Sequence, residues 1–162
     1  MKVAYIQALG GASGDMLLAS MLDAGLEKSE LENLIVDLGL TGIRLQSTST
    51  QRGGVTGTHL DVKLDTNSQI PRRWQDFVRI VEASALSSRV KSQSSEVFGL
   101  IGQAEATVHG VDPEHVHLHE LGTLDTLVDV VGVMFGLETL GLEKVFCSAL
   151  PTGSGTLRSQ HG

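Results

Sequence analysis

The chain has 162 residues, of which 41% are hydrophobic and 19% are charged, a composition typical of a globular domain long enough to bury a core. Its formal net charge of −7 argues against a nucleic-acid duplex or an anionic membrane as the main partner, because both attract positive charge. No stretch approaches the roughly 20 apolar residues of a membrane-spanning helix, and one cysteine with no secretory signal predicts a cytoplasmic protein without intramolecular disulfides.

The first half of the chain predicts a strand, two helices and a hairpin. A glycine-rich loop at residues 9–14 ends the first strand, and a glycine also follows each helix. Gly53 and Gly54 separate two further strands, as in a tight hairpin, and the polar segment 65–71 predicts a loop. In chain order, the predicted elements are strand 2–8, helices 15–24 and 29–38, and strands 43–50 and 58–64.

The second half predicts three more helices and a strand, namely helices 73–83, 89–108 and 124–140 and strand 145–149. Apolar side chains cover most faces of helix 124–140, so we expect it to be buried at the centre of the fold. The predicted fold class is α+β, with a mixed sheet of about four or five strands packed with helices. Because the sequence stops at His161-Gly162 after a turn, we expect residues 1–162 to form a single domain of a longer or split protein.

Three histidines occupy alternate positions, His115, His117 and His119, and Glu120 follows them. An extended segment would project all three imidazoles to one side, and imidazole and carboxylate are the usual ligands of divalent first-row metals. His117 and His119 beside Glu120 are the better candidates, whereas a solvated loop is the alternative. His109 ends a predicted helix and is attributed to interaction with the helix dipole.

A stripe of small and acidic residues runs along helix 124–140, formed by Asp125, Asp129, Gly132 and Gly136. Carboxylates on a buried helix need a metal, an arginine or a water-filled cleft, because removing them from water is costly. In the alternative reading, the glycines permit close helix packing, Asp125 caps the helix and Asp129 points to solvent.

The loop containing Gly10, Gly11, Ser13 and Gly14 joins a strand to a helix, and free backbone N–H groups at such a helix start attract anions. The pattern matches neither the dinucleotide fingerprint nor the P-loop. Asp15 would repel an anion unless a cation intervened, and the alternative is that Ser13 or Asp15 is an ordinary helix cap. Cys147 is expected to be a small buried residue of the last strand.

Taken in order, these segments resemble the N-terminal region of the nickel insertion proteins that make the nickel-pincer cofactor of lactate racemase. The resemblance spans nearly the whole chain. It is carried by residues 2–6 leading into Ser13-Gly14-Asp15-Met16, then 52–54, 108–110, 117–122 with Asp125 and Asp129, 150–156 and His161-Gly162.

The resemblance implies a CTP-dependent cyclometallase, which inserts nickel into pyridinium-3,5-bisthiocarboxylic acid mononucleotide and forms nickel–sulfur and nickel–carbon bonds. CTP and its divalent cation are expected only in a C-terminal region that this sequence lacks, and that C-terminal half and further copies of the chain are the expected partners. In this reading the mononucleotide is held by Gly10, Gly11, Ser13 and Gly14, nickel by His117, His119, Glu120 and Asp125, and the catalytic carboxylates are Asp15 and Asp129.

Gln7, Gly10 and Pro71 depart from the pattern of the family, where acidic, serine and histidine or arginine residues are common. The second hypothesis is a non-catalytic nickel metallochaperone or a regulatory metal-binding module. A zinc-dependent hydrolase is disfavoured, because the sequence contains no HExxH helix.

Overall fold

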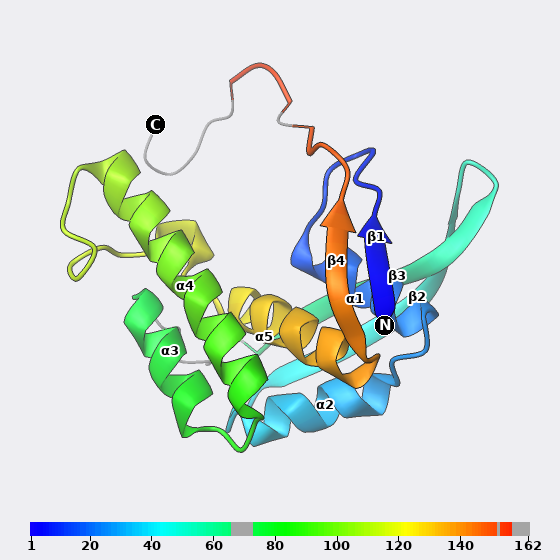
Figure 1. The fold of residues 1–162 in the computed structure, drawn as a ribbon, viewed down its shortest axis with the longest axis horizontal. Helices are drawn as coiled ribbons and strands as arrows, with labels where there is room; N and C mark the ends of the chain where they lie inside the picture. Colours follow the sequence, from blue (N-terminus) through cyan, green and yellow to red (C-terminus); the bar gives the residue numbers. More distant parts are fainter. Residues whose placement is uncertain (66–72, 152, 157–162) are drawn as a thin grey trace.

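The computed structural model describes residues 1–65, 73–151 and 153–156, and within them the chain has the predicted α+β class (Figure 1). The predicted loop at 65–71 lies, apart from Asp65, outside the described residues, as do Pro71 and His161-Gly162. The elements are β1 (Lys2–Ile6), α1 (Gly14–Asp23), α2 (Lys28–Asp37), β2 (Ile43–Arg52), β3 (Val55–Leu64), α3 (Trp74–Ala83), α4 (Ser88–His109), the 3₁₀ turn η1 (His119–Leu121), α5 (Leu124–Thr139) and β4 (Leu142–Cys147).

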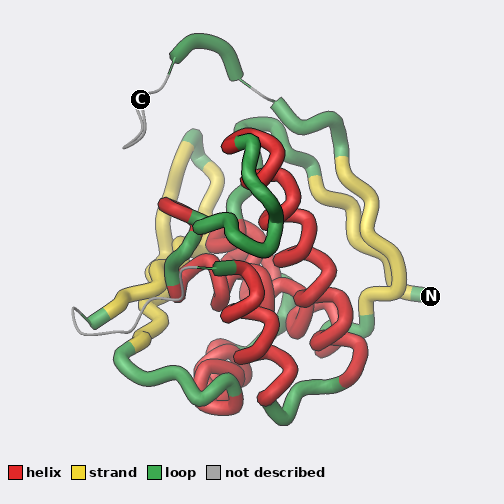
Figure 2. The backbone as a smooth tube through the Cα atoms, turned by 90° about the vertical axis from the view of Figure 1, so that its left-hand side faces the viewer, coloured by secondary structure: helices red, strands yellow, loops and turns green. Residues whose placement is uncertain are grey.

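The four strands form two separate pairs instead of one mixed sheet. β1 pairs with β4 in parallel, with Tyr5 opposite Phe146. β2 and β3 form an antiparallel hairpin around Gly53 and Gly54, whose positive φ angles of 57° and 81° suit a tight two-residue turn. Figure 2 shows the two pairs on opposite sides of the helices. Helix α1 packs against β3, and α5 lies between the pairs and contacts both β3 and β4.

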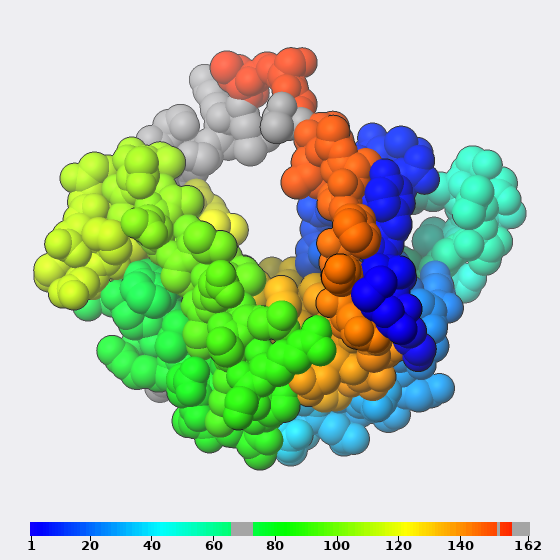
Figure 3. All heavy atoms as spheres, in the orientation of Figure 1, coloured from blue at the N-terminus to red at the C-terminus, as the bar shows by residue number. Residues whose placement is uncertain are grey.

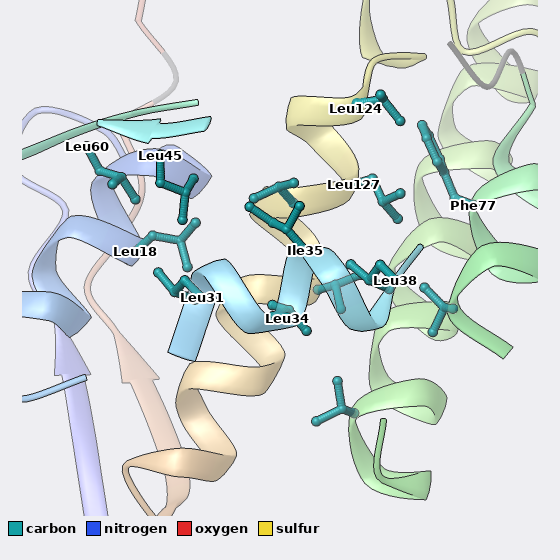
Figure 4. Packing of buried hydrophobic residues seen from close by; sticks show 14 of the residues in the cluster. Leu18, Leu31, Leu34, Ile35, Leu38, Leu45, Leu60, Phe77, Leu124 and Leu127 are labelled. Carbon is teal, nitrogen blue, oxygen red and sulfur yellow. The ribbon is translucent and has the colours of Figure 1, made fainter. Parts of the chain in front are cut away.

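Helix α5 lies at the centre of the core, as its apolar sequence predicts. Leu127 and Val131 are fully buried, and the helix packs against α1, α2 and α4. Figure 4 shows leucines of α2 and the hairpin meeting this helix from one side and Phe77 of α3 from the other. Phe77 in turn packs against Phe98 of α4, with ring centroids 4.9 Å apart.

The glycines of the α5 stripe face α1 at close range. A β-carbon added at Gly132 would lie 3.0 Å from Leu18, and one added at Gly136 would lie 2.6 Å from Met21. This confirms that both glycines serve close helix packing. The contacts advance in the same direction along both helices, so α1 and α5 run parallel and start at the same end of their interface.

Two further observations concern the surface. Cys147 is exposed on β4, so the expectation of a buried cysteine was wrong; the short, two-stranded sheet leaves most of β4 uncovered. Across the part of the chain that the structure describes, no helix combines the length and apolar character needed to cross a membrane.

Candidate functional site

The parallel arrangement of α1 and α5 brings three carboxylates together at the starts of these helices. Asp15 lies in the first turn of α1 and Asp125 in the first turn of α5. Asp129, one turn further along α5, lies directly against α1, because a β-carbon added at Gly14 would fall 2.3 Å from the β-carbon of Asp129. Only glycine at position 14 leaves room for this carboxylate.

Asp129 is in an unusual electrostatic position for a carboxylate. Its Oδ1 is buried and has no hydrogen-bond partner. Burial, and to a lesser degree repulsion from Asp15 and then from Asp125, together raise the pKa of Asp129 to about 6. A carboxyl group with such a pKa can accept and release a proton near neutral pH. The reading in which Asp129 points to solvent was wrong, and Asp125 is not the cap of α5, since that position belongs to Thr123.

The glycine loop leads directly into this acidic group. Ser13 occupies the cap position of α1, but its side chain caps no backbone N–H group; its hydroxyl donates to the Asp15 carboxylate instead. Gly11 adopts a φ of 97°, and open space surrounds the positions where Gly10 and Gly11 would carry a β-carbon. The first N–H groups of a helix have no partner within the helix, so the start of α1 offers donors beside the carboxylates.

The histidine segment is a loop, and it alternates as predicted. Val116 and Leu118 are buried, whereas His115 and His117 are exposed. The backbone then turns at His119, whose φ of 45° lies in the left-handed region that non-glycine residues seldom adopt. This turn begins η1 and aims the His119 imidazole at the end of α4.

His119 joins two residues of α4 there. Glu105 and His109 are one helical turn apart, and Gly110 ends the helix with a φ of 64°. The Glu105 Oε2 lies 3.4 Å from His109 Nε2 and 3.6 Å from His119 Nδ1, and the two imidazole rings are 4.5 Å apart between centroids. One ligand atom from each of the three side chains lies within 4.8 Å of the others.

The structure therefore divides the predicted site residues between two groups. It brings Asp15, Asp125 and Asp129 together at Gly14, and it places His119 with two residues that the sequence argument did not select. His117 and Glu120 are exposed and do not belong to the histidine group. The spacing of Glu105 and His109 on one helix face was a signal that could have found them.

Both groups lie on segments that border one hollow. Figure 3 shows an opening between the end of α4 and the β1–β4 pair, with α5 along its lower edge. The start of α1 lines one side and the yellow segment around η1 lines the other. The segments that carry the two groups therefore border the same opening.

Comparison with known proteins gives the family. The family model described as "Nickel insertion protein" matches residues 4–162. A "Putative nickel insertion protein" of Geobacter sp. (strain M21) is 40% identical over the whole chain, which covers 42% of that relative. The "Pyridinium-3,5-bisthiocarboxylic acid mononucleotide nickel insertion protein" of Desulfitobacterium hafniense (strain DSM 10664 / DCB-2) is 39% identical over the whole chain, which covers 40% of it.

No solved structure matches the chain, and the chain spans about two fifths of the length of the curated relatives that it matches. The match to the family model nevertheless runs over almost every residue, including both groups of side chains at the hollow. The chain belongs to the nickel insertion protein family.

Proposed function

We propose that this chain is the nickel- and precursor-binding part of a CTP-dependent cyclometallase, which inserts nickel into pyridinium-3,5-bisthiocarboxylic acid mononucleotide to form the nickel-pincer cofactor of lactate racemase. The name of the Desulfitobacterium relative supports this substrate. The observation that carries the proposal is the acidic group of Asp15, Asp125 and Asp129 at Gly14, beside a loop suited to a phosphate. The reaction belongs to the cytoplasm in this proposal.

The chemistry of the precursor matches the two sides of this site. The pyridinium nitrogen of the precursor carries a positive charge, which a carboxylate attracts, and the precursor's two anionic thiocarboxylates are left to bind nickel away from the aspartates. Its phosphate is an anion, and the backbone N–H groups at the start of α1, with Gly10, Gly11, Ser13 and Gly14, offer hydrogen bonds to it. The cationic ring also answers the objection that Asp15 repels an anion, because the ring lies between the two charges.

Asp129 is the proposed general base. Nickel insertion replaces a ring carbon–hydrogen bond by a carbon–nickel bond: the electron pair of the broken bond forms the bond to nickel(II), and the proton goes to the Asp129 carboxylate. Nickel stays in the same oxidation state, so no oxidant or reductant is required. The raised pKa of Asp129, about 6, suits a group that must take this proton and release it again. Asp15 and Asp125 position the ring and hold the pKa of Asp129 high.

In this proposal the work is divided between two regions. CTP and its divalent cation bind the part of the longer relatives that this chain does not match, and residues 1–162 alone do not complete the reaction. The sequence predicted His117, His119, Glu120 and Asp125 as nickel ligands, and among these His119 lies beside Glu105 and His109 at the end of α4. A metallochaperone is the second candidate, supported by the histidine group; it would bind nickel and ignore the precursor.

The deciding experiment is calorimetric titration of the chain with the mononucleotide precursor in the absence of nickel. We expect binding, and we expect Asp129→Asn to weaken it about tenfold or more, because a charge-assisted contact with the cationic ring is lost. Asp37→Asn, an exposed position of α2, is the matched control and should bind like the wild type. Precursor that does not bind the chain, or binds Asp129→Asn equally well, refutes the proposal.

The proposed partner region has a candidate docking face on the β1–β4 pair. Val3, Tyr5 and Phe146 are exposed on one face of this pair, and Figure 1 shows the pair at the edge of the fold. We assign this face to the remaining part of the longer relatives, because those relatives are more than twice the length of this chain. Tyr5→Ser with Phe146→Ser should abolish sedimentation of the chain with that separately expressed part. Unchanged co-sedimentation, or a stable homo-oligomer of the chain built on this face, contradicts the assignment.

A further inference from the structure

A second site follows from the histidine group at the end of α4. We infer that Glu105, His109 and His119 form the holding site for the nickel ion before its insertion. The inference rests on the proposed function for the identity of the ion, but its evidence is separate, because none of the three side chains belongs to the acidic group.

The donor atoms have the spacing of a coordination sphere. Two ligands on opposite sides of an ion, each bound at about 2.1 Å, are roughly 4.2 Å apart. The three donors lie within 4.8 Å of one another, so small side-chain rotations close them around an ion. The Glu105 oxygen faces His109 Nε2 at 3.4 Å and His119 Nδ1 at 3.6 Å, and both distances exceed the usual hydrogen-bond range of about 2.7–3.2 Å. The carboxylate and the two imidazoles thus gather around one point.

The backbone holds these side chains in place. Glu105 and His109 are fixed on one face of α4 by the helix itself, and the helix ends at Gly110, directly after the second ligand. His119 is brought to them by its left-handed backbone, φ 45°. Such a conformation costs on the order of 1–3 kcal/mol and is typical of functional sites. A loop whose histidines only contact water would have no interaction to offset the cost of this left-handed backbone.

The set of ligands suits an ion that must be passed on. Imidazole and carboxylate bind nickel(II) without the grip of a thiolate cage. Three protein ligands leave coordination positions open, so that the sulfur atoms of a bisthiocarboxylate can bind the ion before the protein releases it. The side chains are reachable from solvent, with exposed fractions of 23% for Glu105, 33% for His109 and 26% for His119. The end of α4 and the segment around η1, which carry the three side chains, border the hollow in Figure 3.

The test titrates the chain of residues 1–162 with nickel chloride alone, using calorimetry and competition with a coloured chelator. We expect one tightly bound ion per chain. Glu105→Gln and His109→Ala should each weaken binding about tenfold or more, because even residues that only orient a ligand contribute that much. His119→Asn is the third variant, since asparagine tolerates the left-handed backbone and keeps the turn.

The controls are His59→Ala on the exposed face of β3 and His115→Ala, both of which should bind nickel like the wild type. X-ray absorption should show two imidazoles on the ion in the wild type and one in His109→Ala. Circular dichroism of each variant identifies any that fails to fold, and Glu105→Gln keeps the shape of the side chain.

The inference is overturned if Glu105→Gln and His109→Ala bind nickel as tightly as the wild type, or if His117→Ala alone weakens it. Zinc bound at these residues in place of nickel overturns the assignment of the ion. Either result leaves the precursor titration unaffected, because that experiment contains no metal.

Discussion

Asp129→Asn should make the protein more stable, and the gain should depend on pH in a defined way. The pKa of Asp129 is about 6 in the folded chain, against 3.8 as the reference value for an unfolded one. A shift of about two pKa units corresponds to about 3 kcal/mol. Because the folded pKa is raised, the protonated carboxyl favours folding. Ionisation of this carboxyl therefore lowers the free energy of unfolding as the pH rises above 3.8, and the full loss is reached above about pH 6.

The size of the gain follows from linkage between protonation and folding. Below pH 3.8 the carboxyl is protonated in both states and its charge costs nothing; as pH rises from 3.8 through 6 the folded state loses stability. The excess stability of Asp129→Asn should therefore be about 3 kcal/mol at pH 7.5 and should fall to about 1 kcal/mol at pH 4.5. Asparagine keeps the shape of the side chain, so the comparison isolates the charge.

Urea unfolding of the wild type and Asp129→Asn at several pH values measures this difference, and other titrating groups cancel because both proteins contain them. Asp37→Asn, exposed on α2, should show no such trend. A difference between wild type and Asp129→Asn that is constant over pH, or that favours the wild type at pH 7.5, would refute the claim that Asp129 is held as a strained charge.

Three further substitutions test the packing and charge around the helices. Gly14→Ala should lower the free energy of unfolding by about 1–3 kcal/mol in urea, because its β-carbon would overlap Asp129, whereas Gly10→Ala, with open space around it, should not; equal losses contradict the contact. Gly102→Ala should cost a similar amount and shift the emission of Trp74, the one tryptophan, whose ring lies 2.3 Å from the new β-carbon; unchanged fluorescence contradicts it. Hydrogen bonds from Thr58 lower the pKa of Asp23, so Asp23→Asn should lose stability most at neutral pH and least in acid, the reverse of Asp129→Asn; urea unfolding over the same pH range reveals the sign.

Local pattern was enough to predict the helices and the hairpin. Apolar spacing located α4 and α5 to within about one residue at each end, and the Gly53-Gly54 pair located the turn between β2 and β3. These features depend on neighbours in sequence: a helical period, a cap, a turn residue with positive φ. The glycines of the α5 stripe also predicted a close helix contact, because small residues at helical spacing let another helix approach. The sequence did not show that this helix is α1.

The association of strands and the composition of the histidine group depend on contacts between distant segments. Strand patterns do not say which strands pair, and here α1 and α5 separate the two pairs that a single sheet would have joined. Regular alternation along residues 115–119 would place the three histidines on one side, and the sequence argument selected His117 and His119 as ligands. The left-handed backbone at His119 breaks that alternation, and the His119 imidazole therefore lies beside Glu105 and His109 of α4. A left-handed residue other than glycine leaves no clear mark in a sequence.

Two structural features that lower the stability of the fold lie on segments that border the hollow. Among the described residues, the side-chain oxygens that are buried without a hydrogen bond belong to Gln75, Gln93, Ser94 and Asp129, and Asp129 is the one that ionises. His119 is the one described non-glycine residue with positive φ. Each feature lowers the stability of the fold, and each lies on a segment that borders the same opening. Asparagine in place of Asp129 and glycine in place of His119 would each remove a destabilising feature. Since the chain keeps both residues, we infer that a ligand uses the carboxylate and the imidazole.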